Sequence, residues 1–238
     1  MGFDKPNIIL LSTKTLHHLA LIKKINESNK YNLLIIFVLE KIKKKNLFFK
    51  KQEKFEKKFF FNNRKYNFYN QVYYVKDVNS EKTKKIIISK KPKLGILFGT
   101  KKVDKQIIRL FKKRLLNIHR GIMENYRGLD SEFWACYYND FNSIGTTIHI
   151  VNKYLDKGKL IFQNKLKLKK KMKAYQLRYY TTLIAIKNII KIINMICYKK
   201  KIITNHKNQK HGKYYSSIPN RFKEIAYKKF DNYCLRLK

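Results

Sequence analysis

The sequence is short of acidic residues, cysteine and long apolar runs, and each shortage excludes a class of protein. Three cysteines, Cys136, Cys197 and Cys234, stand far apart, so neither a disulfide framework nor a Cys-x-x-Cys metal site is indicated. The longest apolar run, residues 33–39, suits a strand and is too short to span a membrane. The first residues lack the apolar region of a signal peptide. A cytoplasmic protein without a membrane segment is therefore expected.

The shortage of acidic residues leaves a large positive charge. Only 15 Asp and Glu stand against 56 Lys and Arg, so the formal net charge is +41. One interpretation is a polyanionic partner such as RNA, because basic surfaces release counterions from phosphates on binding. The other is compositional drift, since Lys, Ile, Asn, Phe and Tyr are enriched together while Gly, Ala, Pro and Arg are scarce. We favour drift, which says nothing about the fold, and expect weak contact with RNA in either case.

What the first half of the sequence does contain is an alternation of short apolar runs and helical patterns. The apolar runs predict buried strands, and they are residues 7–12, 31–40, 72–78 and 94–99. Thr13 or Thr15 is expected to cap the first helix. His17 and His18, at the start of that helix, are interpreted as a solvated or partly packed pair. The alternation predicts an α/β fold with a mostly parallel sheet flanked by helices.

A basic and aromatic segment, residues 41–69, has two interpretations. Basic side chains interleaved with Phe and Tyr suit single-stranded nucleic acid, whose bases stack on aromatic rings. The segment lacks the glycine-containing motif of aromatic RNA readers, so we favour a partly helical crossover with lysines on its wet side.

In a parallel sheet, ligands bind beyond the carboxyl ends of the strands. This rule directs attention to the loop after Ser12 and to the loop that opens with Gly99, Thr100 and Lys101. Neither loop holds a GxGxxG or GxxxxGK[ST] motif, so a dinucleotide or P-loop nucleotide site is disfavoured.

Residues with chemical function gather in the middle of the chain. Residues 115–119 alternate like a short strand, with Asn117 and His119 on one face. An Asn amide donates to a carbonyl oxygen as negative charge builds there, and a His moves protons. After a loop at residues 120–128 and a strand at 144–151 comes Asp156, whose carboxylate is expected to reach a His. Such an Asn–His–Asp set suits acyl transfer to an amine.

Four short blocks in this region resemble the folate-dependent formyltransferase family, which includes glycinamide ribonucleotide, methionyl-tRNA and nucleotide-sugar enzymes. The blocks are Asn117-Ile118-His119, Tyr126-Arg127-Gly128, Gly145-Thr146-Thr147-Ile148-His149 and Leu155-Asp156-Lys157-Gly158. Their order and spacing match the family pattern of N-I-H, Y-[RP]-G, G-x-[TS]-[VI]-H and L-D-x-G. The resemblance covers residues 94–161, and the earlier residues share only a compatible βαβ pattern.

The resemblance implies a Rossmann-like formyltransferase fold that uses 10-formyltetrahydrofolate and no metal. It implies that Asn117 holds the formyl oxygen, that His119 stabilises charge there, and that Asp156 orients the His and helps remove the amine proton. The residues expected to contact the folate are Gly99, Thr100, Lys101, Lys102, Val103, Asn152 and Leu155. The residues expected to contact the acceptor are Arg120, Tyr126, Arg127 and Gly128.

The rest of the chain bears on the acceptor. Residues 1–168 are predicted to form the catalytic domain, and residues 169–238 a helical extension packed on it, with a basic linker at 199–213. No run of short alternating strands indicates the barrel of a methionyl-tRNA enzyme. We therefore expect formyl transfer to a primary amine, first of all an amino sugar on a nucleotide. The alternatives are a methionyl-tRNA formyltransferase lacking a recognisable barrel, and a basic RNA-binding protein on a decayed scaffold.

Overall fold

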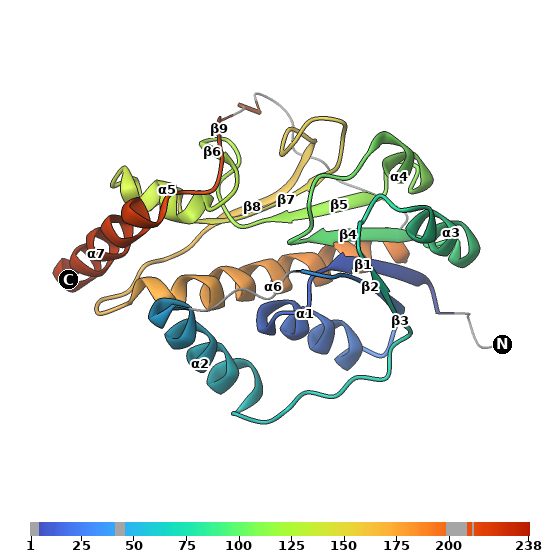
Figure 1. Ribbon diagram of the computed structural model, residues 1–238, viewed down its shortest axis with the longest axis horizontal. Helices are drawn as coiled ribbons and strands as arrows, with labels where there is room; N and C mark the ends of the chain where they lie inside the picture. Colours follow the sequence, from blue (N-terminus) through green and yellow to red (C-terminus); the bar gives the residue numbers. More distant parts are fainter. Residues whose placement is uncertain (1–4, 41–45, 199–208, 211) are drawn as a thin grey trace.

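A computed structural model describes residues 5–40, 46–198, 209–210 and 212–238. Seven strands form one sheet: β1 (Asn7–Ser12), β2 (Asn32–Val38), β3 (Val72–Val75), β4 (Leu94–Phe98), β5 (Leu115–His119), β7 (Gly145–Ile150) and β8 (Leu160–Lys165). Their order is β3-β2-β1-β4-β5-β7-β8 (Figure 1). The first five strands in that order run parallel, whereas β7 is antiparallel to β5 and to β8. The predicted mostly parallel sheet is confirmed.

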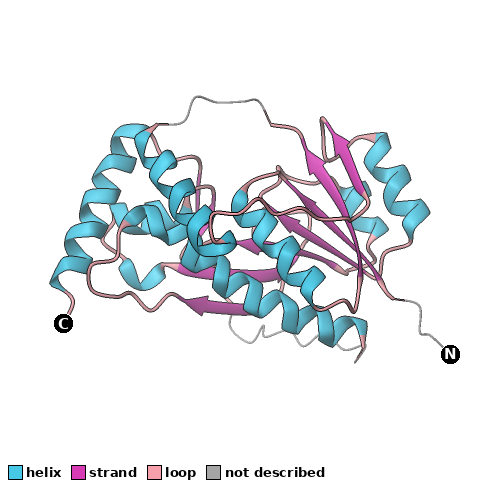
Figure 2. Cartoon of the chain, turned by 90° about the horizontal axis from the view of Figure 1, so that it is seen from below, coloured by secondary structure: helices cyan, strands magenta, loops and turns pink. Residues whose placement is uncertain are grey.

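Helices cover both faces of the sheet (Figure 2). One face carries α1 (Leu16–Glu27) and α6 (Leu177–Cys197), and the other carries α3 (Glu81–Lys90) and α4 (Lys105–Leu110). Successive side chains of β1 point to opposite faces, so Ile8 packs with the first pair of helices and Ile9 with the second. Both side chains are fully buried. This is why the central strands are continuously apolar in sequence.

The basic and aromatic segment forms the helix α2 (Leu47–Phe61), as the crossover interpretation predicted. The side chain of Asn46 caps it by accepting from the N–H of Phe49 at 3.0 Å. The rings of α2 are largely used in packing: Phe60 lies 4.6 Å from Tyr179 between ring centroids, and Phe61 lies 5.7 Å from the ring of Tyr66. This packing favours a structural role for the described part of the segment.

A smaller core lies beside the sheet, where α5 and α7 meet (Figure 1). Its elements are α5 (Ser131–Tyr137), α7 (Asn220–Arg236) and the 3-10 turns η1 (Phe141–Ser143) and η2 (Ala174–Gln176). Next to it, β6 (Tyr126–Gly128) pairs in parallel with β9 (Lys213–Tyr215). The prediction of a plain loop at 120–128 is wrong here, because the partner strand is remote in sequence. Most of the predicted linker at 199–213 lies outside the described residues.

Helix α6 belongs to the main core. Its Ala185, Ile189 and Ile193 are fully buried in the same cluster as α1 and the central strands. Residues 174–197 are by length and composition able to cross a membrane, but 56% of the apolar window is buried inside the fold. That burial is typical of a core helix. The domain boundary predicted at residue 168 stays a prediction. In the structure, α6 lies after this boundary but packs on β4 and β7, which lie before it.

Candidate active site

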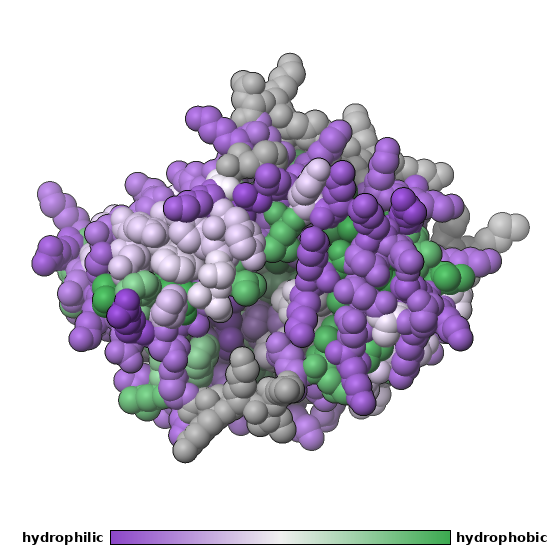
Figure 3. Space-filling view, turned by 45° about the horizontal axis from the view of Figure 1, so that its top comes forward, coloured by the Kyte–Doolittle hydropathy of each residue, from purple (hydrophilic) through white to green (hydrophobic). Residues whose placement is uncertain are grey.

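The strand order reverses around β1, whose two neighbours are β2 and β4. Loops that leave the carboxyl ends of β1 and β4 therefore diverge, and in open α/β sheets ligands bind in the crevice between such loops. A cavity of about 350 Å³ lies there. Figure 3 shows a face of the protein that is mostly covered by hydrophilic residues. This face is hollowed near its middle.

The cavity brings most of the predicted site residues together. All three predicted catalytic residues, Asn117, His119 and Asp156, line it. The seven residues expected to contact the folate also line it: Gly99, Thr100, Lys101, Lys102, Val103, Asn152 and Leu155. Of the residues expected to contact the acceptor, Arg120 and Gly128 line the cavity, whereas Tyr126 and Arg127 do not.

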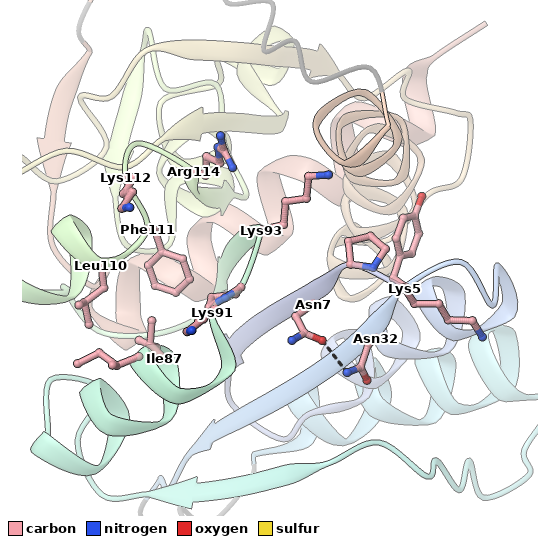
Figure 4. A pocket seen from close by; sticks show the side chains of 14 residues that line it. Lys5, Asn7, Asn32, Ile87, Lys91, Lys93, Leu110, Phe111, Lys112 and Arg114 are labelled. Carbon is pink, nitrogen blue, oxygen red and sulfur yellow. Dashed lines mark hydrogen bonds between the residues drawn. The ribbon is translucent and has the colours of Figure 1, made fainter. Parts of the chain in front are cut away.

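A larger hollow, of about 1510 Å³, opens at the amino ends of the central strands (Figure 4). The basic side chains around it are Lys5, Lys91, Lys93, Lys112 and Arg114. On its floor the Asn32 amide donates to Asn7 Oδ1 at 2.6 Å. None of its 14 lining residues is His, Cys, Asp or Glu. The carboxylates and imidazoles predicted for the site are therefore in the smaller cavity.

Asn117 lies at the centre of a cross-strand cluster with His149. The two residues pair directly across β5 and β7, so both side chains leave the same face of the sheet. Asn117 Nδ2 lies 3.1 Å from Asp156 Oδ1 and 3.3 Å from His149 Nε2. In the tautomer in which His149 Nδ1 donates to the Ile150 carbonyl at 3.0 Å, Nε2 is free to accept from Asn117. Both amide hydrogens of Asn117 are engaged, and the longer contact, to His149, is the easier one for a ligand oxygen to replace.

His119 is buried against the same carboxylate. Its Nε2 donates to the Tyr126 carbonyl at 3.0 Å, which leaves Nδ1 facing Asp156 Oδ2 at 3.6 Å. Burial lowers the pKa of His119, and the neighbouring Asp156 opposes this only in part. The ring is therefore neutral near pH 7, with its lone pair on Nδ1. A proton that arrives on Nδ1 is held between the ring and the carboxylate.

Asp156 is the most heavily contacted member of the cluster. Besides Asn117 and the two His rings, the N–H of Gly128 donates to its Oδ2 at 2.9 Å. Burial by itself raises the pKa of Asp156, but His119, His149 and the Gly128 N–H outweigh it and hold the pKa far below its usual range. The carboxylate is therefore ionised near pH 7 and well into the acidic range.

Two glycines allow close backbone contacts around Asp156. Gly128 has a φ of 93°, and a Cβ there would collide with the carbonyl of Tyr215. A Cβ at Gly158 would collide with the carbonyl of Ile150. Asp156 itself is left-handed, with a φ of 45°, a conformation that its side-chain contacts hold in place. The glycines of two sequence blocks are thus explained by close approach of backbones.

Tyr126 and Arg127 brace the site from outside the cavity. Arg127 Nε donates to the Gly212 carbonyl at 2.6 Å, and its Nη1 donates to the Leu155 carbonyl at 3.2 Å. Arg127 thereby ties the segment before β9 to the residue that precedes Asp156. That these two residues contact the acceptor stays a prediction. The sequence offered no signal for Gly212, which is 85 residues away from Arg127.

His17 and His18 correct the sequence interpretation. They are 4% and 2% exposed, so they are buried rather than solvated, and both line the cavity. Thr15 is the N-cap residue of α1, but its hydroxyl bonds to no backbone N–H and instead lies 2.9 Å from Nδ1 of each ring. The ring of Phe98 meets His18 edge-on at 4.6 Å. The hydroxyl and the aromatic ring together offset part of the cost of burying the imidazoles.

Acid should unfold the protein partly through these two rings. Burial lowers the pKa of His18 from 6.5 to about 3 and also lowers the pKa of His17, so below pH 6.5 the unfolded chain binds protons that the folded chain does not. Stability then falls by about 1.4 kcal/mol per pH unit for each such His. We expect His18→Gln to reduce the stability lost between pH 7 and pH 5 by about 2 kcal/mol, measured by urea unfolding. An equal loss in variant and wild type would contradict this.

Two ion pairs that the sequence did not predict contribute three of their four residues to one wall of the cavity. Glu56, on α2, accepts from Arg178 Nε and Nη2 at 2.6 and 2.7 Å. Arg120 Nη1 lies 3.3 Å from Glu132 Oε1, on α5. Arg120, Glu132 and Arg178 line the cavity. Because these residues come from separate elements, only the tertiary fold reveals that they are neighbours.

A Rossmann-like sheet whose cavity holds an Asn–His–Asp cluster defines a group-transfer domain. A family model described as formyl transferase matches residues 6–192, so the chain belongs to the formyl transferase family. The resemblance noted in the sequence and the predicted formyltransferase fold are confirmed.

Individual relatives agree with this assignment. The chain is 27% identical over 101 residues to the bifunctional polymyxin resistance protein ArnA of Wigglesworthia glossinidia brevipalpis, a stretch that is 42% of this chain and 15% of that protein. The fold of this chain is similar to that of a 4-N formyltransferase from Francisella tularensis, with 18% identity and a TM-score of 0.62. The match covers 94% of this chain and 86% of the other.

The formyltransferase PseJ from Anoxybacillus kamchatkensis has a similar fold. That structure was solved with UDP-4,6-dideoxy-4-formamido-L-AltNAc and tetrahydrofolate. It shares 16% identity and a TM-score of 0.51 with this chain, and the match covers 88% of this chain and 85% of PseJ. Identities this low show a shared fold and leave the acceptor to be argued from the site.

Proposed function

We propose that this protein transfers the formyl group of 10-formyltetrahydrofolate to a primary amine. The observation that carries the proposal is the contact of Asn117, His119 and Asp156 within one cavity at the carboxyl ends of the strands. Membership of the formyl transferase family and the tetrahydrofolate bound to PseJ support the choice of donor.

The cluster contains a group for each step of the transfer. When bound, the folate supplies an activated formyl carbon. Asn117 donates Nδ2–H to the formyl oxygen as negative charge develops there, a contact of the kind that contributes about 10²–10³ in kcat. As the new C–N bond forms, the amine proton passes to His119 Nδ1, and Asp156 stabilises the charged ring. The proton then leaves on N10 of tetrahydrofolate as the bond between N10 and the formyl carbon breaks.

The side of the cavity near Gly99 suits a folate. Val103, Val151 and Leu155 give it apolar surface for a flat ring. The backbones of the loops at residues 99–103 and 152–155 offer N–H and C=O groups to the edge of a pterin. Lys101 and Lys102 are exposed beside it, and their charge suits the carboxylates of a glutamate tail.

We infer that the acceptor is an amino sugar carried on a nucleotide. The PseJ complex holds a UDP-linked 4-formamido sugar, which is the product of formyl transfer to the 4-amino group of such an acceptor, and this supports the inference. We also infer a reducing, cytoplasmic location, because Cys136, Cys197 and Cys234 are all buried free thiols.

Calorimetric titration with tetrahydrofolate and a formyl-transfer assay test the function. The acceptor panel contains UDP-linked amino sugars, glycinamide ribonucleotide and methionyl-tRNA. We expect folate binding and formylation of an amino sugar nucleotide. Alanine in place of Asn117, His119 or Asp156 should abolish transfer while circular dichroism stays native. Activity retained in all three variants, or salt-dependent RNA binding with no transfer to any amine, would overturn the proposal.

A further inference from the structure

Glu132, in the first turn of α5, is a buried carboxylate with poor hydrogen bonds. Its side chain is 2% exposed, and its nearest partners are Arg120 Nη1 at 3.3 Å and Thr181 Oγ1 at 3.4 Å. The single hydroxyl proton of Thr181 goes to the nearer acceptor, the Leu177 carbonyl at 2.9 Å. Charge-assisted bonds to a buried carboxylate usually measure about 2.7–2.9 Å. Glu132 therefore keeps unused capacity to accept hydrogen bonds.

Glu56 shows how this protein satisfies a buried carboxylate that has only a structural role. It is fully buried, and both of its oxygens accept from Arg178, at 2.6 and 2.7 Å. It does not line the cavity, whereas Glu132 does. The contrast indicates that Glu132 is left open toward the cavity for a ligand.

Arg120 has unused capacity as well. A guanidinium carries five N–H donors, and in the described part of the chain the contact with Glu132 is the one hydrogen bond that Arg120 makes. Its side chain is 29% exposed and lines the cavity one residue after His119. A carboxylate and a guanidinium, each under-used, thus stand side by side near the catalytic cluster.

Such a pair selects against charged groups on a ligand. A phosphate attracted by Arg120 is repelled by Glu132, and an ammonium attracted by Glu132 is repelled by Arg120. Neighbouring hydroxyls satisfy both, because one O–H donates to the carboxylate while another oxygen accepts from the guanidinium. We propose that Glu132 and Arg120 bind the ring hydroxyls of the acceptor and so determine its specificity. This inference rests on the proposed function.

The neighbouring wall of the cavity is neutral and polar, which agrees with a hydroxylated ligand. It is formed by Thr13, Thr15, His17 and His18. Burial lowers the pKa of both His residues, so the rings are uncharged near pH 7. His18 Nε2 is buried and has no hydrogen-bond partner among the described residues. A ligand hydroxyl is the kind of group that would satisfy this nitrogen.

Calorimetry on the full chain saturated with tetrahydrofolate tests the pair, because without the formyl group no reaction follows. The probes are a UDP-linked 4-amino sugar with a ring hydroxyl beside its amine and the same sugar without that hydroxyl. Glu132→Gln should weaken binding of the hydroxylated sugar by at least about 10-fold, and tetrahydrofolate affinity should not change. Wild type should prefer the hydroxylated sugar, and the variant should lose that preference.

Glu124→Gln is the matched control. Glu124 is a Glu that accepts hydrogen bonds from Gln163 Nε2 at 2.7 Å and from the Lys210 N–H at 3.3 Å, but it does not line the cavity. This variant should bind both sugars like wild type. If Glu132→Gln does not fold, Arg120→Gln carries the test, because a Gln amide can still donate a hydrogen bond to Glu132.

Failure of the specificity inference can be distinguished from failure of the proposed function. The inference is overturned if Glu132→Gln and wild type bind the hydroxylated sugar equally, if wild type binds both sugars equally, or if sugar and tetrahydrofolate affinity fall together. It is also overturned if wild type binds tetrahydrofolate and formylates only an amine without hydroxyls. The proposed function itself fails if wild type binds no tetrahydrofolate and formylates none of the amines.

Discussion

Replacement of Asp156 by Asn should lower kcat/KM for formyl transfer by about 10³-fold or more. The two carboxylate oxygens accept from two donors, the Asn117 amide and the Gly128 N–H. An Asn side chain at position 156 has one oxygen and can accept from only one of these donors. Its NH2 group would then face the second donor, and no hydrogen bond could form there. It also removes the negative charge that stabilises a proton on His119. Steady-state kinetics with saturating 10-formyltetrahydrofolate as the donor measure the effect.

Asp231→Asn is the control for this prediction. Asp231 Oδ1 accepts from the Ala174 N–H at 2.7 Å, and Oδ2 lies 3.5 Å from Lys173 Nζ, so its role is structural. It does not line the catalytic cavity. Asp231→Asn should therefore leave kcat/KM nearly unchanged. Activity of Asp156→Asn within tenfold of wild type, in a protein with native circular dichroism, would remove Asp156 from the mechanism.

Much of the sheet is visible in the sequence because burial leaves a strong pattern there. β1, β2 and β4 are covered on both faces, so each is a continuous apolar run. β6 and β9 escaped prediction because three-residue strands leave no such pattern, and their pairing depends on Arg127 and Gly212 meeting across the fold. Local patterns therefore identify the long buried elements and miss the short ones.

The same division holds within the site. Asn117 and His119 could be predicted because strand alternation places them on one face, and their neighbours belong to a recognisable motif. Glu132 and Arg178 could not, because in sequence each is a charged residue on an amphipathic helix, where the usual position is on the surface. The burial of His17 and His18 was missed for a similar reason, since it depends on Phe98, which lies on β4 and is remote in sequence.

Replacement of Arg178 by Met should destabilise the protein by about 3–5 kcal/mol. The change leaves Glu56 fully buried without the two short bonds that it receives from the guanidinium. An uncompensated buried charge is more costly than the loss of a favourable contact, because water cannot replace the missing partner. For a chain of this length the melting temperature should fall by about 10 °C. Differential scanning calorimetry at pH 7 measures the shift.

A double-mutant cycle separates the cost of the orphaned carboxylate from the value of the pair. Glu56→Leu combined with Arg178→Met removes both charges and should recover most of the lost stability, since buried ion pairs are often no better than apolar residues of similar size. Lys24→Met is a contrasting control, because it breaks the exposed Lys24–Glu27 pair and should change the melting temperature little. If the double variant is as unstable as Arg178→Met alone, the pair stabilises the fold through its own hydrogen bonds. In that case the arginine is needed for more than neutralising Glu56.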